Sequence, residues 1–201
     1  GMESTMANYG VIDLGSNSVR LVIFDVKDGI NKKKPITCKD FRSIINDKVM
    51  AGLSAYVEAG EFTQEGIARA VDVLSGHLKR ARYFNCVRTD IFATAVLRNC
   101  TNSRKAIRAI EEAIGAHVNL LSARDEAHLS FTGASCDRTI EKGTVVDLGG
   151  GSTELIRVEE GRDFDDVSIG QGSLSSYAGY VEFVMPQADE VEAIERAFLD
   201  Q

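Results

Sequence analysis

The sequence predicts an α/β protein with mixed β-sheets, and two observations support that prediction. Extended runs and amphipathic helices are expected to alternate as β-β-β-α-β-α-β up to Leu121. The segment VIDLGSNSVRL from Val11 resembles VVDLGGGSTEL from Val145, and each reads as strand, tight turn, strand. A repeated unit of this kind indicates two α/β domains, which we expect at residues 7–122 and 123–201.

The expected elements of the first domain each rest on a local pattern. Thr63 is expected to cap a helix that runs to Tyr83, because apolar residues recur there at helical spacing. Gly115 is expected to end a second helix. The full expectation is a hairpin at 9–26, an extended run at 35–45, a helix at 63–83, a strand at 87–96, a helix at 103–114 and a strand at 117–121.

The second domain is expected to begin with a helix at 122–134, with Ser122 as its N-cap. Strands are then expected at 144–149, 152–158 and 166–169, followed by helices at 174–183 and 188–199. A duplicated α/β domain contains further strand–helix units, so we expect the second domain to be truncated. Such a domain exposes a strand edge, which predicts a homodimer.

Composition narrows the classes of function. The formal net charge of −7 argues against nucleic acid as a partner, because such binding depends on clustered Lys and Arg. No apolar run has the length of a membrane span, so we expect a cytoplasmic protein without a membrane partner. The four cysteines form no CxxC pair and are expected to be reduced thiols.

The two turns have the composition of phosphate-binding loops. Glycines let backbone N–H groups approach an anion, and Gly149, Gly150 and Gly151 meet that need fully. In the first turn Gly15 is followed by Ser16, Asn17 and Ser18, which add hydroxyl and amide donors. Ordinary hairpins also use glycine, but two matching turns, each led by Asp, favour phosphate.

The aspartates that lead the turns suggest a metal. Asp is a poor strand former, and a capping role alone does not account for its occurrence at both Asp13 and Asp147. Two carboxylates that face a phosphate-binding cleft are suited to Mg²⁺ or another divalent metal. Strand alternation places Glu154 on the same side as Ser152, which makes it a third candidate ligand.

The ordered motifs resemble the exopolyphosphatase and guanosine pentaphosphate phosphohydrolase (Ppx/GppA) family of the actin and hexokinase superfamily. The resemblance covers the chain from about Tyr9 to its last residue. It includes VIDLGSNSVRLVIFDV, TAVLRN, SARDEAHLSFTGA, VVDLGGGSTEL and SIGQGSLS. The implied fold is the two-domain, ribonuclease H-like (actin-like ATPase) architecture.

The resemblance implies a role for each matching residue. Glu126 corresponds to the general base that activates water, and Arg98 to a phosphate-contacting arginine. The family's metal-associated carboxylates fall on Asp13, Asp147 and Glu154. The expected phosphate-binding set is Gly15, Ser16, Asn17, Ser18, Lys48, Gly149, Gly150, Gly151, Ser152, Thr153 and Ser173.

The predicted function is hydrolysis of terminal phosphoanhydride bonds in polyphosphate or in guanosine penta- or tetraphosphate. The family's helix reads Ser-Gly-x-Glu-Glu-Ala, whereas this chain has Ala123 and Asp125 at the second and fourth of those positions. A binding module without catalysis is the alternative, because the second domain is expected to be truncated. An ATPase or kinase of the same superfamily is the third hypothesis, although the sequence contains no recognisable adenosine pocket.

Overall fold

The computed structural model describes residues 6–27, 41–134, 143–148, 153–159 and 162–169. The chain divides into two compact units, residues 1–121 and residues 122–201. The expected helices at 174–183 and 188–199, the first part of the extended run at 35–45, and Gly149, Gly150, Gly151, Ser152 and Ser173 lie outside the described residues.

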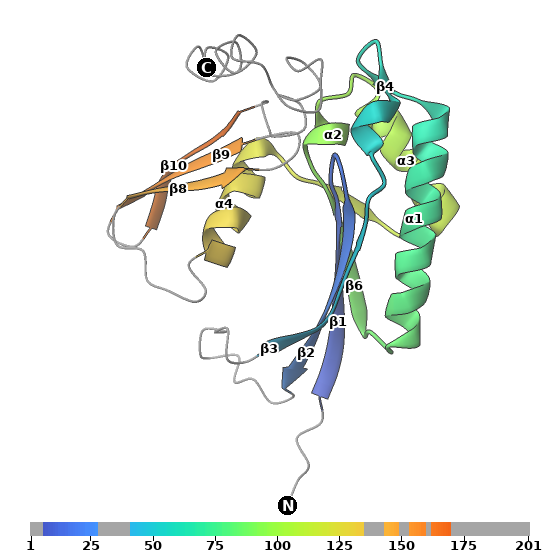
Figure 1. Ribbon diagram of the computed structural model, residues 1–201, viewed down its shortest axis with the longest axis horizontal. Coiled ribbons are helices and arrows are strands. Elements are labelled where there is room, and N and C mark those ends of the chain that lie inside the picture. The colour runs from blue at the N-terminus through green and yellow to red at the C-terminus, as the bar shows by residue number, and fades with distance from the viewer. Residues whose placement is uncertain (1–5, 28–40, 135–142, 149–152, 160–161, 170–201) are drawn as a thin grey trace, which may run out of the picture. The chain divides into compact units, whose positions relative to one another are not determined.

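Unit 1 is built on a five-stranded mixed sheet (Figure 1). Its strand order is β3-β2-β1-β6-β7, with β1, β2 and β3 antiparallel and β1, β6 and β7 parallel. Helices α1 and α3 pack against each other beside this sheet. The bounds are β1 Met6–Leu14, β2 Val19–Lys27, β3 Phe41–Val49, α1 Gln64–Tyr83, β6 Arg88–Ala93, α2 Ala95–Arg98, α3 Ser103–Ile114 and β7 Val118–Leu120.

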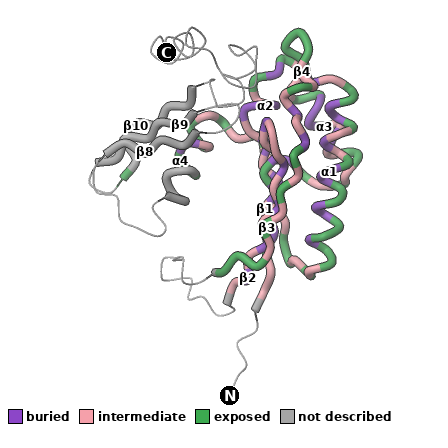
Figure 2. Tube along the Cα trace, viewed as in Figure 1, coloured by how far each residue is buried: buried purple, intermediate pink, exposed green. Residues whose placement is uncertain are grey.

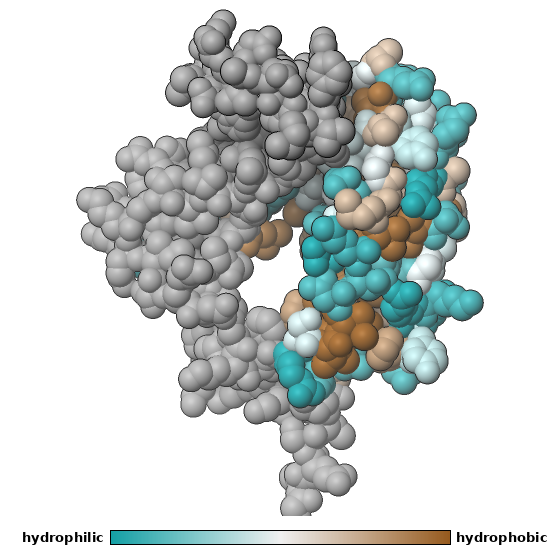
Figure 3. Space-filling model, in the orientation of Figure 1, coloured by the Kyte–Doolittle hydropathy of each residue, from teal (hydrophilic) through white to brown (hydrophobic). Residues whose placement is uncertain are grey.

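Alternation along the strands separates two faces of this sheet. Ile12, Leu14 and Leu21 are fully buried, whereas Asp13 between the first two is exposed. The buried face meets α1, whose apolar stripe includes Ala70 and Leu74 (Figure 2). The visible surface of unit 1 is mixed, with hydrophobic areas among hydrophilic ones (Figure 3). On the opposite face, residues such as Asp13 and Lys48 are exposed.

The helix ends of unit 1 confirm the sequence prediction. The Thr63 hydroxyl accepts a hydrogen bond from the Gly66 N–H at 3.1 Å, so Thr63 caps α1. Gly115 follows α3 with φ of 67°, a left-handed conformation that favours glycine. Both caps depend on local chemistry, which explains why sequence alone located them.

Three features of unit 1 correct the predicted elements. The third strand continues to Val49, four residues beyond its expected end, because polar residues alternate outward on this edge strand. The predicted strand at 87–96 ends at Ala93 and is followed by the helical turn α2. A short hairpin of β4 (Val57–Glu58) and β5 (Glu61–Phe62), preceded by the 3-10 helix η1 (Leu53–Tyr56), was not predicted.

The unpredicted hairpin has a physical explanation. Its two-residue turn places Ala59 at φ 49° and Gly60 at φ 77°. This is the conformation that Asn-Gly or Asp-Gly ordinarily signals, and alanine rarely adopts it. The turn is held from outside, since the Thr101 N–H donates to the Gly60 carbonyl at 2.9 Å. A tertiary contact therefore imposes a conformation that the local sequence does not favour.

Unit 2 pairs helix α4 (Ala123–Ala134) with a three-stranded antiparallel sheet. The strands are β8 (Gly143–Leu148), β9 (Thr153–Glu159) and β10 (Arg162–Ile169), in the order β10-β9-β8. α4 packs against all three strands. The predicted cap is confirmed, because the Ser122 hydroxyl accepts from the Asp125 N–H at 3.1 Å.

Candidate active site

The first turn connects β1 to β2 through Gly15, Ser16, Asn17 and Ser18. The Gly15 N–H donates to the Ser18 carbonyl at 3.1 Å and closes the turn. A Cβ on Gly15 would lie 2.9 Å from that same carbonyl oxygen, closer than real Cβ atoms approach backbone. The glycine is therefore required by the tightness of the turn.

Three carbonyl groups of this turn accept hydrogen bonds from backbone N–H groups of unit 1. The Ser16 carbonyl accepts from Ser54 N–H and the Asn17 carbonyl from Gly52 N–H, each at 2.9 Å. The Ser18 carbonyl is used by Gly15, as above. Within the described part of the chain, the N–H groups of Ser16, Asn17 and Ser18 donate to no backbone carbonyl. An array of successive amides of this kind is an anion-binding arrangement.

A row of charged residues crosses the sheet beside this turn. Asp13 on β1 lies directly opposite Arg20 on β2, and Arg20 lies directly opposite Lys48 on β3. Directly opposite residues share a face, and this is the face away from the core. The Arg20 guanidinium donates to the Asn46 side-chain oxygen at 2.6 Å. The structure therefore brings predicted residues Asp13 and Lys48 onto one face, two strands apart.

Arg20 is a candidate that the sequence analysis did not single out. The sequence could have indicated Arg20, because the predicted hairpin has a four-residue connection from Gly15 to Ser18. Counting outward from that connection pairs Leu14 with Val19 and Asp13 with Arg20, which is the observed register.

Arg98 lies at the end of α2, half-buried. Its Nη1 donates to the Leu121 carbonyl at 3.2 Å, and the Leu121 N–H donates to the Ala93 carbonyl at 3.0 Å. A guanidinium has five N–H donors in a planar fork, which suits phosphate oxygens. The structure thus places this predicted residue where the chain leaves the sheet of unit 1.

Glu126 lies in unit 2, in the first turn of α4, and is half-buried. Its N–H donates to the Ser122 carbonyl at 3.0 Å, which continues the helix from its cap. The neighbouring Asp125 is exposed and uses its own N–H in the cap. The two acidic residues of this turn therefore differ in burial, and partial burial is the environment expected of a general base.

The second turn is flanked by β8 and β9, whose register is known. Leu148 pairs with Thr153, and Asp147 pairs with Glu154. Asp147 and Glu154 therefore lie on one face of the sheet in neighbouring strands. Like charges directly opposite each other destabilise a sheet, whereas a divalent cation is stabilised by two carboxylate ligands. This register fits a metal site.

Among residues with described side chains, no group of three or more His, Cys, Asp or Glu residues could hold a metal ion. Asp147 and Glu154 fall outside that set.

Also within the described residues, no helix combines the length and the apolar character needed to cross a bilayer.

Cysteine chemistry is not indicated at the turn. Cys86 and Cys100 are free thiols, as predicted. Burial raises the pKa of the Cys100 thiol, and burial outweighs the hydrogen bond with Thr89 in raising the pKa of Cys86. Both thiols therefore remain protonated and poorly nucleophilic at neutral pH.

A cavity of about 260 Å³ also opens on unit 1, near the start of α1 and α3. Its charged lining residues are two glutamates and one lysine, and their net negative charge disfavours binding of a polyanion. None of the predicted phosphate-binding residues lines it. The lining is Glu58, Glu61, Phe62, Thr63, Gln64, Ile67, Asn102, Lys105 and Ala109.

Comparison with known proteins identifies the family. The Ppx/GppA phosphatase family matches residues 22–200. The chain belongs to the Ppx/GppA phosphatase family. This confirms the resemblance that the two turns and the segments between them suggested.

Two relatives of this family member illustrate the range of named activities. A guanosine-5'-triphosphate,3'-diphosphate pyrophosphatase from Photobacterium profundum is 30% identical over 157 residues, which cover 77% of this chain and 29% of that protein. Exopolyphosphatase 2 from Mycobacterium tuberculosis is 28% identical over 159 residues, which cover 75% of this chain and 48% of that protein. The chain spans less than half the length of these two relatives.

Solved structures confirm the predicted fold class. The Aquifex aeolicus member of the Ppx/GppA family matches with a TM-score of 0.73 and 24% identity, over 94% of this chain and 59% of that chain. An exopolyphosphatase from Cytophaga hutchinsonii matches with a TM-score of 0.79 and 20% identity, over 96% and 60%. The fold is therefore the mixed-sheet α/β, actin-like type.

Proposed function

We propose that this chain carries phosphohydrolase chemistry, releasing the terminal phosphate of inorganic polyphosphate or of guanosine pentaphosphate by in-line attack of water. The observation that supports this proposal most strongly is the first turn. The carbonyl groups of Ser16, Asn17 and Ser18 accept hydrogen bonds within unit 1, and the N–H groups of the same three residues are left as donors for phosphate oxygens. The named activities of the two relatives agree with this chemistry.

Each proposed site residue has a role that follows from the chemistry of its donor or acceptor groups. The amides of Ser16 to Ser18, with Arg20 and Lys48 beside them, bind and orient the phosphate oxygens. Arg98 neutralises negative charge on the transferred group. The Glu126 carboxylate accepts the proton of the attacking water at one of its oxygens. The three described basic residues offset the negative charge of the whole chain locally.

The second turn completes the proposed phosphate-binding set with Gly149, Gly150, Gly151, Ser152 and Thr153, together with Ser173. Asp147 and Glu154 would hold Mg²⁺ or another divalent metal, with Asp13 at the corresponding position of the first hairpin. When bound, the metal supplies positive charge that stabilises the charge developing on the phosphoryl oxygens.

The proposal also includes location in the cytoplasm and self-association as a homodimer, and it excludes nucleic acid and membranes as partners. The net charge of −7 supports the exclusion of nucleic acid. Light scattering of the purified chain at high concentration tests the dimer, and a strictly monomeric species contradicts it.

Replacement of the proposed base tests the function. Phosphate release from polyphosphate and from guanosine pentaphosphate is measured with Mg²⁺ for wild type and for Glu126→Gln. We expect kcat to fall by about 10²–10⁴, the usual contribution of a general base, while tripolyphosphate binding is kept. Asp125→Asn, in the same helical turn, is the matched control and should stay within about twofold of wild type.

Two other experimental outcomes would assign the chain to a different class of function. Binding of polyphosphate without release by the wild-type chain would assign it to the alternative class, a binding module. An affinity for ATP above that for polyphosphate would favour the ATPase or kinase hypothesis instead.

A further inference from the structure

His77 is a buried polar residue that the proposed chemistry does not use. It lies on α1 with 2% of its surface exposed, between the buried residues Leu74 and Leu78. A leucine or phenylalanine fills such a core position without desolvating polar atoms. Burial of an imidazole is unfavourable unless its nitrogen atoms find partners, so the partners of His77 indicate its role.

One ring nitrogen of His77 contacts the backbone of the first hairpin. The Nε2 atom lies 2.9 Å from the Val19 carbonyl oxygen, and this contact is buried. A carbonyl oxygen only accepts, so Nε2 carries the proton and donates it. Val19 follows Ser18 directly and its carbonyl belongs to the peptide that leads into Arg20. His77 therefore fixes the peptide plane between the turn and Arg20.

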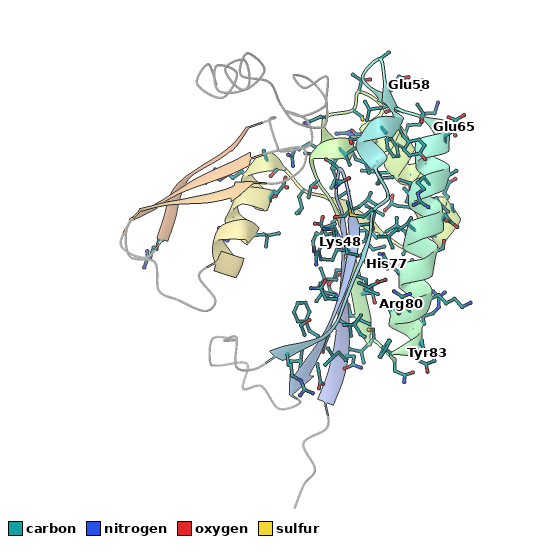
Figure 4. All side chains as sticks on the ribbon, in the orientation of Figure 1. Lys48, Glu58, Glu65, His77, Arg80 and Tyr83 are labelled. Carbon is teal, nitrogen blue, oxygen red and sulfur yellow. The ribbon has the colours of Figure 1, made fainter. Side chains whose placement is uncertain are left out.

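The other ring nitrogen faces charged groups at the edge of the sheet. Nδ1 lies 3.6 Å from the Asp47 carboxylate, an electrostatic contact that is too long for a hydrogen bond. Arg80, one turn further along α1, forms an ion pair with the same carboxylate oxygen. Asp47 directly precedes Lys48 on β3, and Figure 4 labels His77 and Arg80 on α1.

The hydrogen bond from His77 differs from the other hydrogen bonds of the turn because its donor is a side chain. The carbonyls of Ser16, Asn17 and Ser18 accept from backbone N–H groups, which any residue except proline supplies. The Val19 carbonyl accepts from a side chain. Of these four hydrogen bonds, the one to Val19 is therefore the one that a side-chain substitution removes. The three backbone hydrogen bonds then remain.

We propose that His77 is a positioning residue of the phosphate-binding turn. Its imidazole holds the Val19 carbonyl toward the core and so fixes the angle at which the turn amides and Arg20 meet a polyphosphate. This inference rests on the proposed function, because it assumes that the turn binds phosphate. His77 itself is too deeply buried behind the sheet to contact a ligand at the turn.

Binding of inorganic tripolyphosphate, measured by calorimetry together with Tm, tests the inference. His77→Leu removes the donor while keeping an apolar core side chain, so we expect Kd to rise about fivefold, with a fall in Tm of a few degrees because the buried Val19 carbonyl loses this donor. His77→Gln places an amide N–H near the position of Nε2 and should restore Kd to within about twofold of wild type. A merely structural role would also change Tm but would leave Kd unaltered.

Leu78→Ala is the matched control on the same helix. It opens a cavity without touching the hairpin backbone, so Tm should fall while Kd for tripolyphosphate is unchanged. If His77→Leu does not fold, His77→Asn replaces it, because the asparagine amide is too short to reach Val19 and the same rise in Kd is expected.

The failures of the two proposals are distinguishable. Wild-type binding of tripolyphosphate with an unchanged Kd in His77→Leu, or in His77→Asn, overturns this inference alone. A raised Kd that His77→Gln does not restore also overturns it. Absence of both tripolyphosphate binding and phosphate release in the wild-type chain overturns the proposed function and this inference together.

Discussion

The strands that flank the two Asp-Leu-Gly turns share one register and differ in the charge at one cross-strand position. In each, four residues connect the strands and the Leu before the connection pairs with the residue after it. In each, Asp is the next residue back, but its partner is Arg20 in the first hairpin and Glu154 in the second. The same backbone unit thus presents a mixed-charge pair in unit 1 and an acidic pair in unit 2.

Under the proposed function, this difference gives the two hairpins different main contributions, while Asp13 stays a candidate metal ligand and the glycines of the second turn stay candidate phosphate-binding residues. A guanidinium beside an array of successive backbone amides favours binding of an anion, whereas two neighbouring carboxylates favour binding of a divalent cation. A duplicated unit can therefore bind both a polyphosphate and its counter-cation with a change at a single cross-strand position. The predictions below test that division, from the largest expected effect to the smallest.

Reversal of charge in the second hairpin should have the largest effect. Glu154→Arg gives this hairpin the charge pair of the first and removes a proposed metal ligand. Phosphate release in Mg²⁺ should fall by about 100-fold or more, because the metal contributes several kcal/mol to transition-state stabilisation. Initial rates over a range of Mg²⁺ concentrations measure this, with Glu159→Gln at the far end of β9 as control. An unchanged Mg²⁺ dependence would remove Glu154 from the metal site.

Loss of the basic partner in the first hairpin should weaken substrate binding. Arg20→Gln removes a charged donor from the row that contains Asp13 and Lys48. We expect Kd for tripolyphosphate to rise about tenfold and its salt dependence to become shallower. Calorimetry at two salt concentrations measures both effects. Equal affinity and equal salt dependence in the variant would show that the row does not contact the ligand.

The tightness of the first turn predicts a contrast between two glycines. Gly15→Ala brings a Cβ within 2.9 Å of the Ser18 carbonyl, so the turn must shift. Gly76→Ala, in α1, meets nothing within 4 Å and replaces a poor helix former by the best one. We expect about fivefold weaker tripolyphosphate binding and a lower Tm for Gly15→Ala. Gly76→Ala should raise Tm by a few degrees with binding unchanged.

A carboxylate outside both hairpins provides a baseline for effects on stability alone. The Val118 N–H, which donates to Glu111 at 2.9 Å, and the contact with His117 together lower the pKa of the Glu111 carboxyl. A depressed pKa contributes stability that is present above the unfolded-state pKa and is lost as the pH falls through the folded-state pKa.

Glu111→Gln should therefore lower Tm by about 2 °C at pH 7, and the difference should vanish as the pH falls from about 5 toward 3. Thermal unfolding across this range measures the effect, and phosphate release at pH 7 should be unchanged. A difference that persists at pH 3 would show that the hydrogen-bond geometry, and not the charge, is responsible.

The sequence by itself determined the features that depend on local chemistry. Thr63 and Ser122 were recognised as helix caps because a hydroxyl next to an apolar helical pattern has one favourable use. The two turns were recognised because glycine and Asp at matching positions report backbone requirements directly. The roles of Asp13, Lys48, Arg98, Glu126, Asp147 and Glu154 remain predictions that the experiments above test.

Tertiary structure decided the features that depend on partners distant in the sequence. The Ala59-Gly60 turn is held by Thr101, and no local pattern signals it. Arg20 became a candidate through the register between strands, and His77 through its contact with a carbonyl 58 residues away. The physical reason is the same in each case: a side chain's role depends on which backbone group it meets, and only the folded sheet brings those groups together.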